Sequence, residues 1–221
     1  IIYPAPGHET ENMLKKECGN KPYLLIADSL AVKEGETASP TIQPDYLEIG
    51  RRLGEQLKTK EQKIGIIADW KMSEAVQAEI SGLTEALEGS GSEISWCIYR
   101  RKEQNITERM KEETKADALV ILDPGVLEEF GEQAEHGKYK GAELYGVGYS
   151  LKTVALLDKG NIQGLVVPDG YEIGYKSVKE IAGKIEHKFY KMQGYTTEYQ
   201  IFSKKDFFMD DDLERFLYSY E

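Results

Sequence analysis

The chain has 221 residues, of which 40% are hydrophobic and 30% charged, and its formal net charge is −11 at pH 7. Binding to duplex DNA requires lysine and arginine to displace the counterions around phosphate, so this balance argues against nucleic acid as a partner of this segment. No apolar run reaches the roughly 18 residues of a membrane helix, so we expect no membrane span in this segment.

Short apolar runs alternate with helical patterns along the chain. We predict strands at 1–3, 23–27, 63–68, 94–99, 118–122, 144–147 and 164–167, and helices at 12–17, 46–57, 73–87, 106–115, 126–134, 153–157 and 171–187. Continuous runs such as YLLIA and ALVIL are typical of strands that are buried on both faces of a parallel sheet. The alternation therefore predicts an α/β fold in which helices flank parallel sheets.

Two segments interrupt this alternation. Residues 32–44 (VKEGETASPTIQP) contain Pro40 and Pro44 and precede Asp45, which suits a helix N-cap. We interpret them as a strand-poor connector. From residue 190 onward the chain becomes aromatic and acidic, and we expect 190–206 to provide a last strand.

Polar and aromatic residues follow the predicted strands. Open α/β sheets bind ligands beyond the carboxyl ends of their strands. The candidate ligand-binding residues at these ends are Asp28, Asp69, Trp70, Arg100, Arg101, Asp123, Tyr149 and Asp169. Aromatic faces stack on sugar rings, and aspartate and arginine hydrogen-bond to vicinal hydroxyls, so this set predicts a site for a sugar-like molecule.

A structural interpretation of the same residues stays open. Trp70 also suits a core position at a strand edge. Each aspartate also suits a helix N-cap, and Asp123 suits it best because Pro124 favours the first helical position.

Catalytic and metal-binding patterns are sparse. His8, His136 and His187 are far apart, and none shares metal-ligand spacing with a cysteine or carboxylate. We find no phosphate-binding loop, no nucleophile elbow and no complete dinucleotide fingerprint. We therefore expect that the protein is not an enzyme and uses no cofactor or metal.

The segment 143–188 carries a family resemblance. It reads as a strand, the Gly-rich turn GVGYS, a helix, a strand, the break Pro168-Asp169-Gly170 and a long helix. This order resembles the last third of the type I periplasmic sugar-binding proteins and the related effector domains of LacI-type repressors. The resemblance implies two α/β lobes that close on a small molecule, with hinges near 40–45 and 168–171.

The resemblance also implies a division into domains. The N-terminal lobe is expected to contain residues 1–43 plus 168–189, the C-terminal lobe 44–167 plus 190–206, and an acidic aromatic tail 207–221. Because the chain opens at what resembles the third strand of the first lobe, we expect this lobe to be incomplete here. A rearranged first lobe of two or three strands is the alternative.

The pocket positions of the family match only in part. Asp28 stands where ribose-type binding proteins place a sugar-binding aspartate, but most other mapped positions have lost their usual side chain. These positions are Ser29, Glu79, Leu122, Gly148 and Pro168. We expect either a ligand other than a plain pentose or hexose, or a site that uses Arg100, Arg101, Tyr149 and Trp70 instead.

The resemblance implies an extracytoplasmic solute-binding protein, periplasmic or anchored as a lipoprotein, that delivers a sugar-like ligand to the permease of an ABC transporter. The alternative is the ligand-sensing effector domain of a LacI-like regulator, which would be cytoplasmic, or of a membrane signalling protein. An enzyme on a flavodoxin-like scaffold is a third interpretation, but the sequence offers no nucleophile or base with an orienting partner.

Overall fold

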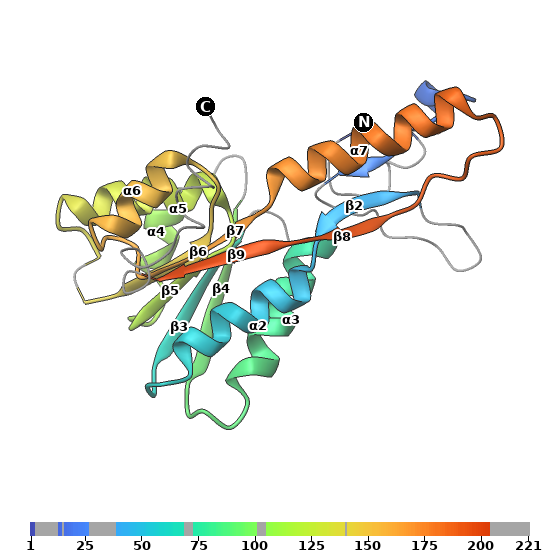
Figure 1. The fold of residues 1–221 in the computed structure, drawn as a ribbon. Helices are drawn as coiled ribbons and strands as arrows, with labels where there is room; N and C mark the ends of the chain where they lie inside the picture. The colour runs from blue at the N-terminus through green and yellow to red at the C-terminus, as the bar shows by residue number, and fades with distance from the viewer. Residues whose placement is uncertain are drawn as a thin grey trace.

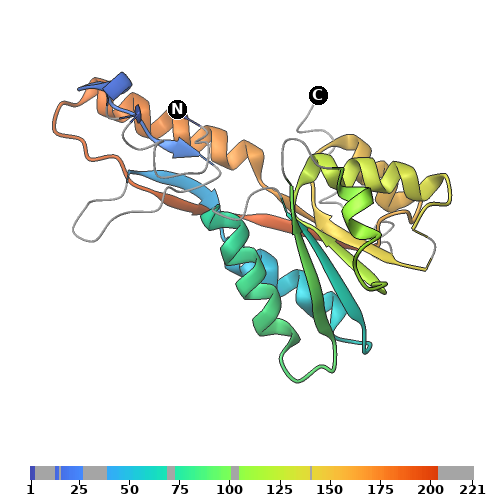
Figure 2. The ribbon, with the colours of Figure 1, turned by 180° about the vertical axis from the view of Figure 1, so that it is seen from behind.

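The computed structural model describes residues 1–2, 13–14, 16–26, 39–68, 73–100, 105–139 and 141–203. In these residues the strands form a six-stranded sheet in the order β4-β3-β5-β6-β7-β9 and a three-stranded sheet in the order β1-β2-β8. Figures 1 and 2 show the smaller sheet and helix α7 extending from one side of the larger sheet.

The larger sheet is mainly parallel. Its strands are β3 (Lys63–Ala68), β4 (Glu93–Tyr99), β5 (Ala118–Ile121), β6 (Glu143–Val147), β7 (Gly164–Pro168) and β9 (Tyr199–Ser203). Strands β3 to β7 run parallel, whereas β9 pairs antiparallel with β7. The predicted α/β fold with parallel sheets and flanking helices is confirmed.

Helices cover both faces of this sheet. The first face packs against α2 (Tyr46–Leu57) and α3 (Glu74–Leu87), and the second packs against α5 (Pro124–Glu135) and α6 (Leu151–Asp158), with α4 (Ile106–Met110) beside β4. Ile66 points toward α2 and α3, whereas its neighbour Ile67 points toward α5 and α6, and both are fully buried. Burial on both faces explains why these strands are continuously apolar.

The smaller sheet contains β1 (Leu25–Ile26), β2 (Thr41–Pro44) and β8 (Tyr195–Thr197), all parallel. Of the strand predicted at 1–3, the described part is an isolated bridge between Ile2 and Leu25. Helix α7 (Gly170–Glu186) contacts β2 and β8. Its buried residues are Ser177, which donates to the Ile173 carbonyl of the same helix, and Glu180, which accepts from the Tyr195 hydroxyl of β8.

One sequence-based expectation about strands was wrong, and another was incomplete. Residues 32–44 were expected to lack a strand, but 41–44 form β2 because Ile42 is fully buried and pairs with Tyr195. Residues 190–206 were expected to provide a last strand that returns to the second lobe, and β9 is that strand, but β8 was missed. They contain two strands, of which β8 joins the smaller sheet and β9 the larger, because Thr197 pairs with Pro44 whereas Tyr199 pairs with Pro168. The domain limits as a whole stay a prediction, and the tail 207–221 lies outside the described residues.

Within the described residues the chain passes between the two sheets three times. The first crossing joins Pro44 of β2 to Asp45, which caps α2; the second joins Pro168 of β7 to Asp169, which caps α7; and the third is Glu198, between β8 and β9. In both ribbon views β8 and β9 follow one another from the smaller sheet into the larger one. The crossings are neighbours because β8 pairs with β2 and β9 pairs with β7.

Glycines allow α2 and α3 to pack closely against each other. A Cβ atom on Gly50 would collide with the backbone carbonyl of Glu79, and one on Gly82 would collide with the carbonyl of Leu47. Each helix therefore presents bare backbone to the other at these two points. The first crossing ends at the start of α2, so this contact anchors it to the larger sheet.

We expect Gly50→Ala to destabilise the protein by about 1–3 kcal/mol, because the rigid helix backbones must separate to admit the methyl group. Differential scanning calorimetry should then show a melting temperature lower by about 2–12 °C. Gly174→Ala is the matched control, since it lies in the exposed interior of α7 with nothing within 4 Å of the added Cβ. That change should raise stability by about 0.5–1 kcal/mol. An unchanged melting temperature for Gly50→Ala would contradict the close packing.

Candidate functional site

The carboxyl ends of strands β3 to β7 meet at one edge of the larger sheet. Backbone hydrogen bonds continue past the strand ends: the Arg100 amide donates to the Ala68 carbonyl at 2.8 Å, and the Leu122 amide donates to Ile67 at 2.8 Å. The Gly148 amide donates to Val166 at 3.0 Å. The residues that follow β4, β5, β6 and β7 therefore gather at the edge where α/β proteins bind ligands.

Arg100 and Asp123 form an ion pair at this edge. The Arg100 Nη1 atom lies 2.6 Å from Asp123 Oδ2. Because β3 lies between β4 and β5, the pair spans the carboxyl end of β3. The Arg100 side chain is 50% exposed and that of Asp123 is 8% exposed, so a nearly buried carboxylate fixes a guanidinium group that still faces solvent.

Asp123 also caps a helix. Its other oxygen, Oδ1, accepts a hydrogen bond from the Val126 amide at 3.0 Å and caps α5, with Pro124 at the first turn. Asp169 likewise caps α7, because its Oδ1 accepts from the Glu172 amide at 2.8 Å. The capping role that we left open for these aspartates is present at both positions.

Tyr149 lies at the same edge, between β6 and α6, and its side chain is exposed. The next residue, Ser150, caps α6 by accepting from the Thr153 amide at 3.1 Å and donates to Glu128 at 2.7 Å. Hydrogen bonds from Lys152 and Ser150 hold the pKa of Glu128 below its ordinary value. Tyr149 is therefore an exposed ring beside a firmly capped helix.

The structure describes four of the eight site residues that the sequence predicts. Arg100 and Asp123 contact each other, and Tyr149 and Asp169 follow neighbouring strands at the same edge. The other four candidates, Asp28, Asp69, Trp70 and Arg101, lie outside the described residues. Among the described residues, no group of three or more His, Cys, Asp or Glu could hold a metal ion.

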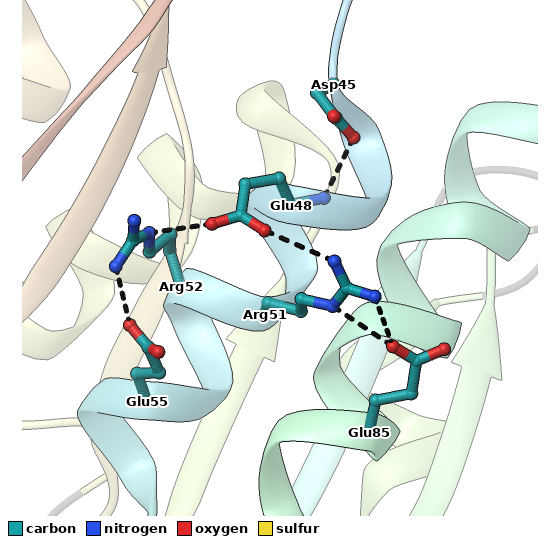
Figure 3. Close-up of polar contacts among 6 residues, drawn as sticks. All are labelled: Asp45, Glu48, Arg51, Arg52, Glu55 and Glu85. Carbon is teal, nitrogen blue, oxygen red and sulfur yellow. Dashed lines mark hydrogen bonds and ion pairs between the residues drawn. The ribbon is translucent and has the colours of Figure 1, made fainter.

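A charged cluster that we did not predict begins at the first crossing. Figure 3 shows Arg51 between Glu85 of α3, at 2.7 Å, and Glu48, at 3.4 Å. Arg52 contacts Glu48 and Glu55, each at 2.9 Å. The hydrogen bonds with Glu85 raise the pKa of Arg51, while a hydrogen bond with the Tyr199 side chain and another with Glu55 raise that of Arg52.

This cluster joins elements rather than offering a ligand site. Arg51 links α2 to α3, whereas the ion pairs of Arg52 lie within α2. Exposed ion pairs of this kind contribute little to stability. The spacing of Glu48, Arg51, Arg52 and Glu55 was the sequence signal that could have revealed the pairs within α2.

The sequence matches no protein-family model and no curated protein, but solved structures match its fold. A glucose-galactose binding protein from Geobacillus stearothermophilus has a TM-score of 0.71 and 18% identity, and the match covers 90% of this chain and 82% of that chain. The Caulobacter myo-inositol binding protein has a TM-score of 0.76 and 14% identity, covering 94% and 73%. A LacI-like transcriptional regulator from Bacteroides fragilis has a TM-score of 0.71 and 12% identity, covering 92% and 74%.

These matches define the class of the fold. The chain has the type I periplasmic-binding-protein fold, as the sequence resemblance implied. It spans 73–82% of the length of these three solved structures. Within the residues that the structure describes, no helix is both long and apolar enough to span a membrane.

We expect Asp123→Ala to lower stability by about 0.5–2 kcal/mol, because α5 loses its N-cap. Calorimetry should show a melting temperature lower by about 1–8 °C. Asp123→Asn is the matched control, since asparagine caps as well as aspartate but lacks the charge that pairs with Arg100. Its effect should be under about 1 kcal/mol because Arg100 is half exposed. If both variants lost the same stability, the ion pair rather than the cap would be the main contribution of Asp123.

Proposed function

We propose that this protein binds a sugar-like solute between its two lobes and acts as the substrate-binding component of an ABC transporter, not as an enzyme. The observation that carries this proposal is the shared fold. Solved structures with this fold include a glucose-galactose binding protein, a myo-inositol complex and an Agrobacterium radiobacter solute-binding protein in complex with D-arabinose. In this role the protein is extracytoplasmic and meets a transporter permease.

The polar groups at the strand ends support this proposal. Arg100 keeps half of its side chain exposed while Asp123 fixes its orientation, so its N–H groups are preorganised toward hydroxyl oxygens of a ligand. The exposed ring of Tyr149 offers an apolar face for a sugar ring. Asp28, Asp69, Trp70, Arg101 and Asp169 complete the set of proposed ligand contacts.

The three crossings support a hinge. Rotation about 44–45, 168–169 and 198 brings the smaller sheet toward the edge that carries Arg100 and Tyr149. Closure removes water from the contacts, which strengthens each hydrogen bond to the ligand.

A ligand-sensing domain is the second candidate function. The likeness to a LacI-like regulator, with a TM-score of 0.71, favours it. In this role the ligand binds between the same two lobes, but its binding changes the activity of a larger protein. That protein is either a LacI-like regulator in the cytoplasm or a membrane signalling protein. The complete gene separates the two: a basic helix-turn-helix segment supports the regulator, and a lipoprotein signal supports the transporter receptor.

We expect a thermal-shift screen against sugars and polyols to identify a ligand. At about 100 times its dissociation constant a ligand adds about 2.7 kcal/mol to the free energy of unfolding. The melting temperature should then rise by about 5–11 °C. A panel without any shift would count against sugar binding.

For a ligand found in this way, we expect Arg100→Ala to weaken the dissociation constant at least about tenfold in isothermal titration calorimetry, or about 1.4 kcal/mol. Arg51→Ala is the matched control, because it removes an arginine of the same lobe that contacts Glu48 and Glu85 on α2 and α3. Its affinity should stay within about twofold of the wild-type value. Equal affinities for Arg100→Ala and wild type would remove Arg100 from the site.

A further inference from the structure

Helix α7 holds both backbone groups of the third crossing. The Glu198 amide donates to Glu172 Oε2 at 2.8 Å, and the Glu198 carbonyl accepts from the Asp169 amide at 3.0 Å. Asp169 is itself the first residue after the second crossing and caps α7. Glu198 of the third crossing is thus hydrogen-bonded to Asp169 and Glu172, which both lie at the start of α7.

Glu172 belongs to a row of side chains along one face of α7. Glu172, Lys176 and Glu180 are spaced four residues apart, so they lie one above another on this face. Glu172 pairs with Lys176 at 2.6 Å, and the Lys176 ammonium lies 5.1 Å from the centre of the Tyr195 ring. The row therefore follows the segment that contains β8.

Glu180 completes the row at its far end. It is almost fully buried and accepts from the Tyr190 and Tyr195 hydroxyls and from the Gln193 amide, each at 2.9 Å. Burial raises the pKa of Glu180, but these hydrogen bonds outweigh burial and bring it below the ordinary value of 4.5. Burial likewise raises the pKa of Glu172, while Lys176 and the Glu198 amide lower it below 4.5. Both groups are therefore ionised acceptors at neutral pH.

Glu198 lies between a strand of the smaller sheet and a strand of the larger sheet, so its contact with Glu172 involves both sheets. Its preceding neighbour Thr197 pairs with Pro44 in the smaller sheet, and its following neighbour Tyr199 pairs with Pro168 in the larger sheet. Any rotation of one sheet against the other must change backbone angles near residue 198. The carboxylate of Glu172 binds the amide at that point from the side of α7.

We propose that Glu172 is the positioning residue of the hinge: by holding the Glu198 amide it makes the second and third crossings turn together as one pivot attached to α7. This inference rests on the proposed function, because closure of the lobes is the motion that it controls. Without the Glu172 carboxylate only the backbone hydrogen bond from the Asp169 amide to the Glu198 carbonyl joins the start of α7 to the third crossing, and the unliganded protein samples a wider range of lobe orientations.

The test compares lobe orientation in the unliganded protein. Spectroscopic labels introduced as unnatural amino acids at the exposed positions Lys179 on α7 and His136 after α5 leave Cys18 and Cys97 unchanged. Pulsed dipolar spectroscopy then measures the distance distribution between the labels, and hydrogen exchange reports on the Glu198 amide. We expect Glu172→Ala to speed exchange at Glu198 and to broaden the distance distribution.

Two variants serve as matched controls. Glu172→Gln retains an oxygen that can accept from the Glu198 amide, and Lys176→Met removes the ion pair but leaves the carboxylate. Both should keep the narrow distribution of the wild type. Glu172→Leu retains the bulk of the side chain without an acceptor, so it replaces Glu172→Ala if that variant does not fold, and it should broaden the distribution in the same way.

The ligand-bound state provides a second readout. If about one-tenth of the Glu172→Ala molecules have the binding-competent orientation, affinity for the sugar found in the screen falls about tenfold, whereas Lys176→Met leaves it unchanged. Faster exchange at Glu198 with an unchanged distance distribution would overturn the proposal and leave Glu172 a purely local contact. The distances require no ligand, so they decide the role of Glu172 even where the sugar panel contradicts the proposed function.

Discussion

The arrangement of the molecule depends on the hydrogen bonds that keep the three crossings side by side. Thr197 pairs with Pro44 in the smaller sheet, and Tyr199 pairs with Pro168 in the larger sheet. A single residue, Glu198, therefore lies between the two paired strands. The two sheets are therefore connected by backbone that is already paired on each side.

The two parts differ in how they are stabilised. The larger sheet has apolar residues buried on both faces, and α2 lies against α3 so closely that Gly50 and Gly82 have no room for a side chain. The smaller sheet buries Leu25 and Ile42 as well, and polar groups add to its contact with α7: buried Glu180 accepts from the Tyr195 hydroxyl of β8, and Glu172 accepts from the Glu198 amide. Apolar packing thus supports both parts, and in the smaller one hydrogen bonds to the carboxylates of α7 are added to it.

At the candidate site one residue, Asp123, both caps a helix and contacts a charged side chain. Asp123 has two carboxylate oxygens: one caps α5, and the other pairs with Arg100. The cap holds the carboxylate in place, and the carboxylate holds the guanidinium at the edge of the sheet. The sequence presented capping and ligand binding as alternatives for this residue; the structure shows the cap, and contact with a ligand stays a proposal.

The sequence by itself determined the alternation of strands and helices from β3 to α7, the parallel direction of strands β3 to β7 and the edge at which polar residues follow these strands. These follow from local patterns: continuous apolar runs, helical spacing, and the fact that parallel strands end at the same side. Asp123 and Asp169 as helix caps were predictable for the same reason, since an N-cap involves residues three positions apart.

Only the tertiary structure decided how distant segments combine. Thr41–Pro44 is a short strand whose partner Tyr195–Thr197 lies far along the chain, and no local pattern in a Pro-flanked connector reveals that pairing. The split of the last segment between two sheets, the contact of Arg100 with Asp123 and the bond from Glu198 to Glu172 have the same origin. Each joins residues whose sequence separation exceeds the period of any helix or strand, so it exists only after the chain has packed.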